Sequence, residues 1–483
     1  MLDNKDQGKI FLSSDYDLDI DERKVKYKNF NIVLCEICKN KINHNWYCRN
    51  CYDNENNEEK YRMLYGKCKR CFQAMKIRSW CLSCNSKRFE QDFNKWTSGN
   101  DEIDKLIKDS QTSSCILEWI PYDRFTDVKF LTEGGFANIS SATWIDGRIE
   151  KWDQESNNWK RSEPIKVALK VSKVMKESMN PNPSEDFLNE LKTLKKFSNY
   201  YHTHVIQCYG ITREPNSLNY ALVLKLKDCS LRDYLHYYYN MLTLKDKLDI
   251  IGRICLALDC IHSHNIIHSD LHSGNILYSF KKKSDISISD FVYCKPVNEI
   301  NSDKMRVYGI MSYMAPEILR YERYTQASDV YSFGIIINEI FSGIQPFHDQ
   351  SNDFTLALDI CHGIRPKIGD ETPEPLKKLI QKCWDTIPEN RPNTNQIYSM
   401  LRDFMYTKRN EDSYDFRKYT NQYKELLRES SYNLEIDTYT SHNTHNSNFL
   451  SAPSCIRTKS TMYELSSSRF TGFDECSDCI ISN

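Results

Sequence analysis

Apolar residues recur between about residues 118 and 405, in short stretches that follow strand-like and helix-like spacing in turn. Residues 1–30 are instead acidic and lack periodicity, and the region 406–483 ends in a tail rich in Ser, Thr, Asn and His. Segments of that composition bury too little apolar surface to fold. The pattern therefore predicts one large packed domain at 118–405, between a flexible acidic N-terminus and a largely disordered C-terminal tail.

A short helix is expected just before the packed domain. Asn100 is followed by an acidic first turn, and Ile103, Leu106 and Ile107 then recur at helical spacing. A capping side chain and acidic residues in the first turn both favour a helix that begins here. We therefore interpret residues 96–117 as a helical linker.

The region before this linker, residues 31–95, contains a repeat of cysteines. Two CxxC pairs separated by nine residues occur twice, and the eight positions are Cys35, Cys38, Cys48, Cys51, Cys68, Cys71, Cys81 and Cys84. Four thiolates complete a tetrahedral zinc shell, and each CxxC turn directs two sulfurs to one point. The repeat predicts a zinc-ribbon-like module with two structural Zn²⁺ ions, whose closed shells leave no open position for catalysis.

The pairing of these ligands has alternatives. We favour sequential ribbons, in which each unit of four binds its own ion, but a cross-brace between the two units uses the same cysteines. His44 lies between two pairs and could replace one cysteine, although a solvated histidine is the simpler interpretation. The basic stretch 67–88 could contact nucleic acid or an acidic partner, and here too a solvated face is favoured.

Charge and cysteine usage indicate the compartment. The chain has 65 Lys and Arg against 66 Asp and Glu, a formal net charge of −1, so no overall field attracts nucleic acid or an anionic membrane. No apolar run approaches the roughly 18 residues of a membrane-spanning helix. The acidic start is the opposite of the basic start of a signal peptide. With eight of its 19 cysteines in CxxC pairs, the chain is expected in a reducing compartment, the cytoplasm or the nucleus, and not outside the cell.

Two segments of the packed domain carry residues suited to a triphosphate. Residues 131–139 contain Gly134, Gly135 and Phe136, and a glycine hairpin can lie against phosphates so that backbone N–H groups bond their oxygens. Further on, an apolar strand ends in Lys170, and a helical stretch places Glu190 after it. An ion pair between these two side chains would hold the ammonium group against the α- and β-phosphates of ATP.

A third segment is more specific. Residues 267–277 contain Asp270 and Asn275, and Asp290 follows in the sequence Ser-Asp-Phe-Val. Phosphoryl transfer needs a carboxylate to accept the proton of the acceptor hydroxyl and oxygen ligands to hold Mg²⁺ over the triphosphate. Asp270 suits the first role. Asn275 and Asp290 suit the second, because Mg²⁺ favours a few carboxylate or amide oxygens together with phosphates and water.

With these motifs, and with Met-Ala-Pro-Glu at 314–317 and Asn-Arg-Pro at 390–392, residues 118–405 resemble a eukaryotic protein kinase catalytic domain of the tyrosine-kinase-like group. The resemblance implies an α+β fold with two lobes, a small and mostly β N-lobe and a larger helical C-lobe, with ATP between them. The polar stretch 146–164 then becomes an enlarged loop between the second and third strands.

The same resemblance implies further contacts. Ile139, Ala168 and Leu277 would sandwich the adenine ring. Glu317 and Arg391 would form a buried ion pair in the large lobe. These assignments follow from the positions of the residues in the family's motifs.

Several positions depart from the usual residues of the family: Thr132, Ala137, Ser269, His272, Val292 and Ile310. None of them is the base, a metal ligand or the phosphate-binding lysine. Ser269 replaces an arginine that in most kinases receives a phosphate on the activation segment, here residues 290–317. Activity is therefore expected without that phosphorylation unless Lys304 or Arg306 supplies the cation. His272 and Ile310 replace a lysine and a threonine beside the acceptor hydroxyl, which alters the basis of acceptor specificity.

The favoured function is an ATP-dependent protein kinase of intracellular signalling, which transfers the γ-phosphoryl group of Mg·ATP to protein hydroxyls, Ser and Thr being favoured over Tyr. The implied cofactors are ATP, Mg²⁺ and structural Zn²⁺, and the implied partners are protein substrates and a protein partner of the zinc module. Nucleic acid is not favoured, and no membrane is expected. The alternatives are a nucleotide-binding pseudokinase scaffold and a zinc-module nucleic-acid or protein binder that the kinase domain regulates.

Overall fold

The computed structural model describes residues 67–73, 75, 80–113, 116–133, 137–172, 182–197, 204–280, 285–298, 308–351 and 353–406. The acidic N-terminus, the first four-cysteine unit and the C-terminal tail expected from the sequence lie outside these ranges. Within them, no helix is both long enough and apolar enough to cross a membrane.

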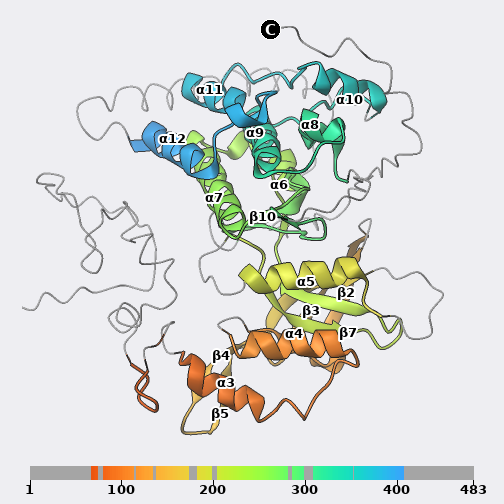
Figure 1. Cartoon of the computed structure of the whole chain (residues 1–483), viewed down its shortest axis with the longest axis vertical. Helices are drawn as coiled ribbons and strands as arrows, with labels where there is room; N and C mark the ends of the chain where they lie inside the picture. Colours follow the sequence, from red (N-terminus) through yellow and green to blue (C-terminus); the bar gives the residue numbers. More distant parts are fainter. Residues whose placement is uncertain are drawn as a thin grey trace, which may run out of the picture. The chain divides into compact units, whose positions relative to one another are not determined.

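A six-stranded sheet forms the smaller lobe, with strand order β1-β7-β8-β6-β3-β2 (Figure 1). Its strands are β1 (Glu118–Trp119), β2 (Phe125–Glu133), β3 (Ala137–Trp144), β6 (Ile165–Ser172), β7 (Cys208–Arg213) and β8 (Tyr220–Lys225). β1 pairs with β7 in parallel, and the other neighbours are antiparallel. Helix α5 (Glu185–Phe197) contributes its buried apolar face to the same core as β7 and β8.

The alternation of side chains along β6 places the lysine at the site. Val167 and Leu169 are buried in one small cluster with Trp144. Successive residues of a strand point to opposite faces of its sheet, so Ala168 and Lys170 belong to the other face. Ala168 accordingly packs against the large core that also holds α5.

The polar stretch 146–164, which the sequence predicts as an enlarged loop, is a β-hairpin of β4 (Ile149–Asp153) and β5 (Asn158–Arg161). The hairpin packs against helix α3 (Leu82–Glu90). Trp159 stacks on Phe89 with ring centroids 4.5 Å apart, and Arg88 lies 4.2 Å from the ring centroid of Trp152. The tryptophans of this stretch are therefore packing residues.

The helical lobe is built around α9 (Gln326–Ser342), which is buried along almost its whole length. The other helices are α6 (Leu231–Tyr238), α7 (Leu244–Ser263), α8 (Pro316–Leu319), α10 (Phe354–Cys361), α11 (Glu374–Cys383) and α12 (Thr394–Tyr406). Thr243 and Thr325 cap α7 and α9 with reciprocal capping boxes. The short strands are β9 (Cys229–Ser230), β10 (Ile266–Ile267), β11 (Ile276–Ser279), β12 (Asp285–Ile288) and β13 (Lys295–Pro296).

Two local predictions are confirmed. Glu317 and Arg391 form a bidentate ion pair at 2.6 and 2.7 Å, which ties α8 to the segment before α12. The helix expected before the packed domain is α4 (Asp101–Gln111). Asn100 caps it by accepting hydrogen bonds from the N–H groups of Glu102 and Ile103, both at 3.1 Å.

Candidate active site

Lys170 connects two carboxylates at the junction of the lobes. Its Nζ lies 2.7 Å from Glu190 Oε1 on α5 and 2.9 Å from Asp290 Oδ1, which follows β12. Burial alone would lower the pKa of Lys170, but the charges of Asp290 and Glu190 outweigh it and raise the pKa above its ordinary value. The lysine is therefore a fixed cation, as the sequence predicts for the Lys170–Glu190 pair.

The backbone of the Asp290 segment bonds to the same glutamate. The N–H group of Phe291 donates to Glu190 Oε1 at 3.3 Å, and the Phe291 side chain is fully buried. Asp290 has a φ of 65°, which a non-glycine residue rarely adopts. Although burial opposes it, the charge of Lys170 holds the pKa of Asp290 below its ordinary value. Val292, which stands where the family has a glycine, needs no positive φ here.

Asp270 and Asn275 lie together in the loop between β10 and β11. Asn275 Nδ2 donates to the backbone carbonyl of Asp270 at 2.9 Å and to its carboxylate Oδ2 at 3.3 Å. Burial, and after it the charge of Asp290, raises the pKa of Asp270 to about 7. The amide nitrogen of Asn275 thus orients the carboxylate of Asp270. The amide oxygen of Asn275 remains available to bind a ligand.

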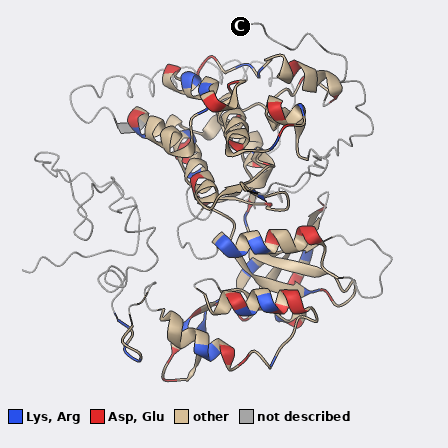
Figure 2. Cartoon of the chain, viewed as in Figure 1, with Lys and Arg blue, Asp and Glu red and all other residues tan. Residues whose placement is uncertain are grey.

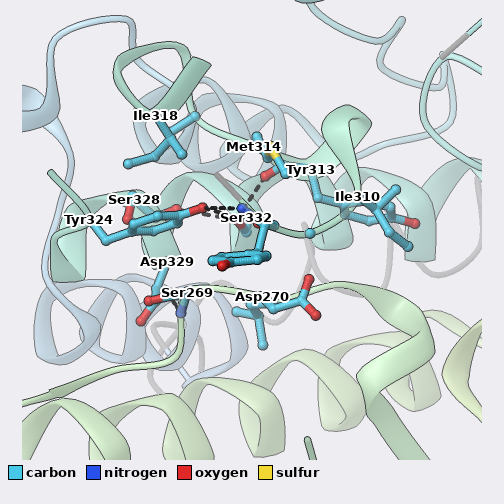
Figure 3. A pocket seen from close by; sticks show the side chains of 14 residues that line it. Ser269, Asp270, Ile310, Tyr313, Met314, Ile318, Tyr324, Ser328, Asp329 and Ser332 are labelled. Atoms are coloured by element: carbon cyan, nitrogen blue, oxygen red, sulfur yellow. Dashed lines mark hydrogen bonds between the residues drawn. The ribbon is translucent and has the colours of Figure 1, made fainter. Parts of the chain in front are cut away.

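The backbone before Asp270 is held by Asp329, near the start of α9 (Figure 3). The Asp329 carboxylate accepts hydrogen bonds from the N–H groups of His268 at 2.8 Å and Ser269 at 3.0 Å, and lies 2.9 Å from His262 Nε2. Ser269 has a φ of 67°. No role for Asp329 was predicted from the sequence, although a carboxylate on a mostly buried helix is the kind of signal that marks a structural anion.

His272 presents a neutral ring beside Asp270. Its Nδ1 accepts a hydrogen bond from the N–H group of Gly274 at 3.0 Å, which leaves the proton on Nε2, 3.7 Å from Asp270 Oδ1. Burial, and after it the charge of Arg232, lowers the pKa of His272 to about 3. A neutral N–H donor therefore occupies the position where the family places an ammonium group.

The hollow between Ser269 and the end of the activation segment is nearly filled (Figure 3). Its volume is about 10 Å³, room for one water molecule at most. Ser269 Oγ is buried, and among the described residues it has no hydrogen-bond partner. On the other side of the hollow, the Tyr324 hydroxyl donates to the backbone carbonyl of Tyr308 at 3.0 Å and accepts from its N–H group at 3.3 Å. A phosphate group has no room here.

The residues predicted to contact adenine are placed on three elements. Ile139 lies on β3, where it is the register partner of Lys170, Ala168 lies on β6, and Leu277 lies on β11. All three side chains are partly exposed. The predicted phosphate-binding residues Gly134, Gly135 and Phe136 lie outside the described residues.

The second four-cysteine unit forms a cluster. The sulfur atoms of Cys68, Cys71, Cys81 and Cys84 lie within 4.8 Å of one another, a spacing compatible with one tetrahedral zinc ion. The four belong to one repeat, which is the sequential pairing. The first unit and His44 lie outside the described residues.

A sheet-based N-lobe, a helical C-lobe and a Lys–Glu–Asp network between them define the class of phosphoryl-transferring kinases. Residues 125–401, more than half of the chain, match the family described as "Protein tyrosine and serine/threonine kinase". The chain belongs to this protein kinase family, and the fold class predicted from the sequence is confirmed.

Similar proteins from several organisms are also named as protein kinases. The chain is 30% identical over 254 residues to the dual specificity protein kinase shkE of Dictyostelium discoideum, covering 50% of this chain and 33% of the relative. It is 28% identical over 241 residues to the serine/threonine-protein kinase STY17 of Arabidopsis thaliana, covering 50% and 40%. Among these matches the chain spans at most 40% of the relative's length, and only 14% of the putative serine/threonine-protein kinase/receptor R831 of Acanthamoeba polyphaga mimivirus.

Proposed function

We propose that this chain is an active kinase of the tyrosine-kinase-like group, which transfers the γ-phosphoryl group of Mg·ATP to protein hydroxyls in intracellular signalling. Ser and Thr are the favoured acceptors over Tyr. The observation that carries the proposal is the bonded network of Lys170, Glu190 and Asp290 next to the Asp270–Asn275 pair. These are the five groups that phosphoryl transfer requires from the protein.

Each of the five has a distinct role in this proposal. Glu190 orients Lys170, whose ammonium group binds the α- and β-phosphates. Asp270 accepts the proton of the acceptor hydroxyl, and its raised pKa of about 7 makes it a stronger base than an exposed aspartate. Asn275 and Asp290 would hold Mg²⁺, because one amide oxygen and a partly exposed carboxylate remain available to a cation. Bound Mg²⁺ would neutralise charge on the phosphates.

The nucleotide itself is assigned by the family resemblance. Backbone N–H groups of Gly134, Gly135 and Phe136 would cover the phosphates, and Ile139, Ala168 and Leu277 would contact adenine. Because kinases with Ser/Thr names and with dual-specificity names both match, the preference for Ser and Thr is part of the proposal.

The test is incubation of the full chain with ATP, Mg²⁺ and a generic protein acceptor, followed by mass spectrometry of the phosphorylated residues. Turnover on Ser or Thr that Asp270→Asn abolishes supports the proposal. Wild-type protein that binds ATP without turnover would instead establish the pseudokinase scaffold, which the changed residues His272 and Ile310 favour as the second candidate.

For the cysteine repeat we propose two structural Zn²⁺ ions, one held by Cys68, Cys71, Cys81 and Cys84 and one by the equivalent cysteines at 35, 38, 48 and 51. The cluster within 4.8 Å supports the first of them. Metal analysis of the full chain should find two Zn per chain, and a chelator should unfold residues 31–95, because zinc binding supplies much of the folding free energy of such modules. Folded metal-free protein would contradict this. Salt-sensitive nucleic-acid binding by the module would favour the alternative of a nucleic-acid binder.

A further inference from the structure

Helix α4 lies outside the region that matches the kinase family, yet its apolar face is fully buried. Ile103 and Ile107 have 0% exposure, and both belong to the same hydrophobic core as Leu191 and Leu194 of α5. A linker that only connected two modules would leave these side chains in water. Their burial instead makes α4 part of the small lobe.

Ion pairs also connect α4 with α5. Glu102 near the start of α4 pairs with Lys192 of α5 at 2.7 Å, and Asp109 near its end lies 3.8 Å from Lys195. Figure 2 shows charged residues of both signs along the two helices that Figure 1 labels α4 and α5. These exposed pairs add little energy, but they indicate which residues face each other.

Both ends of α4 are bonded to the sheet. Before the helix, the Tyr220 hydroxyl of β8 donates to the backbone carbonyl of Ser98 at 3.0 Å. At its end, Gln111 Nε2 donates to the carbonyl of Leu117 at 2.9 Å, and the Leu117 N–H group donates to Ser110 Oγ at 3.0 Å. The next residues form β1, which extends the sheet beside β7. Helix α4 therefore has a fixed position from which to hold α5.

The position of α5 matters because Glu190 lies on it. Glu190 bonds to both Lys170 Nζ and the N–H group of Phe291, so a rotation or shift of α5 breaks the phosphate-binding network at two points. Leu191 and Leu194, on the buried part of α5, follow Glu190 within one helical turn.

We propose that α4 is a positioning element for the kinase reaction. By packing Ile103 and Ile107 against the core of α5, it keeps Glu190 bonded to Lys170, so that the catalytic unit begins near Ser98 and not at the start of the family match at 125. This proposal rests on the proposed kinase function. It assigns the role to a segment with no part in phosphate or metal binding.

The test compares two double variants of the full chain. Ile103→Ala/Ile107→Ala removes the packing of α4, and Ile360→Ala/Ile380→Ala removes two equally buried isoleucines of the helical lobe as a matched control. We expect kcat/KM for ATP to fall about tenfold in the first variant, within the range of residues that couple to a site without touching it. Hydrogen exchange of α5 should rise with it, and the control should change neither quantity.

A double-mutant cycle separates positioning from general destabilisation. In a Glu190→Gln background the α4 substitutions should cost at most about twofold further in kcat/KM, because the bond through which they act is already weakened. An equal loss in both backgrounds would overturn the proposal, as would unchanged α5 exchange in the α4 variant.

A second comparison uses charge. Glu102→Lys puts two lysines side by side and should increase α5 exchange by only about twofold, the scale of one exposed charge pair, and Lys192→Glu in the same chain should reverse it. Asp101→Lys makes the same charge change on the neighbouring exposed residue and should leave α5 exchange unchanged. Absence of this pattern counts against the proposed facing of Glu102 and Lys192. If wild type lacks turnover, the kinase function fails, while the exchange measurements still decide whether α4 holds α5.

Discussion

The proposed nucleotide side and the proposed acceptor side of the candidate site match the residue types of the kinase family to different degrees. On the nucleotide side, Lys170, Glu190 and Asp290 keep both the residue types and the ion pairs, at 2.7 and 2.9 Å. On the acceptor side, Ser269 and His272 have lost the cations that the pattern expects. Binding a triphosphate requires charged side chains, whereas the acceptor loop can be held by hydrogen bonds to its backbone.

The structure shows how the acceptor side keeps its shape. Asp329 accepts hydrogen bonds from the backbone N–H groups of His268 and Ser269, so these contacts do not use the side chain at either position. Tyr324 likewise bonds to both backbone groups of Tyr308. A serine in place of the family's arginine at 269 therefore leaves these contacts intact, and the two sides are expected to respond differently to mutation.

The largest effect on turnover should come from substitution of Asp270, which lies where the two sides meet. Asp270→Asn keeps the shape of the side chain and the bond from Asn275 to the backbone carbonyl, but removes the base. Turnover should fall by about 10²–10⁴, the usual contribution of a positioned general base. Nucleotide affinity, measured by titration with Mg·ATP, should stay within error of wild type. A turnover within tenfold of wild type would remove Asp270 from the proposed role.

On the nucleotide side, Asp290→Ala should weaken Mg·ATP binding directly. Loss of an outer-shell partner already costs a metal site about tenfold or more in affinity, and Asp290 is proposed as a ligand. Asp285→Ala is the matched control, because Asp285 also pairs with two lysines, Lys225 at 2.8 Å and Lys227 at 2.7 Å. The proposal fails for Asp290 if the two variants bind Mg·ATP equally well.

The contrast between the two sides also explains what could be predicted from the sequence. Lys170, Glu190, Asp270, Asn275 and Asp290 could be predicted as one group because phosphoryl transfer requires particular residue types in particular motifs, and the structure shows the contacts among them. The helix at α4 was found from its cap and apolar spacing, but its partner was not, since periodicity identifies a buried face and not what covers it. The hairpin was expected only as a loop, because short polar strands with aromatic packing lack a clear alternation.

On the acceptor side, His272→Lys should shift acceptor preference. The neutral imidazole places Nε2 3.7 Å from Asp270 Oδ1, and a lysine would add a positive charge beside the acceptor hydroxyl. We expect the ratio of kcat/KM for Ser over Tyr peptides to rise about tenfold, the scale of a single changed group in a specificity pocket. The exposed His362→Lys, at the end of α10, is the control. A change confined to the KM for ATP would place His272 on the nucleotide side instead.

The smallest effect is expected from removing the hydroxyls of the activation segment. Tyr308 stacks on Tyr293 with ring centroids 4.4 Å apart, and Tyr324 bonds to its backbone, so the end of the segment is ordered without a phosphate. Ser312 is buried, and the hollow beside Ser269 holds about 10 Å³. Charge-assisted bonds to a phosphate need a cation that Ser269 does not supply.

The variant Ser302→Ala/Tyr308→Phe/Ser312→Ala should therefore keep its activity within about tenfold of wild type, a change of about 1.4 kcal/mol or less in activation free energy. Tyr308→Phe retains the ring that stacks on Tyr293, so the substitution removes only the hydroxyl group that a kinase would modify. Wild-type protein should also keep its activity after phosphatase treatment. A loss of more than tenfold in both comparisons would show that the segment needs a phosphate, with Lys304 or Arg306, which lie outside the described residues, as the cation that receives it. The acceptor side would then also be held by charged side chains, like the nucleotide side. It would differ from the family only in the position from which the cation comes.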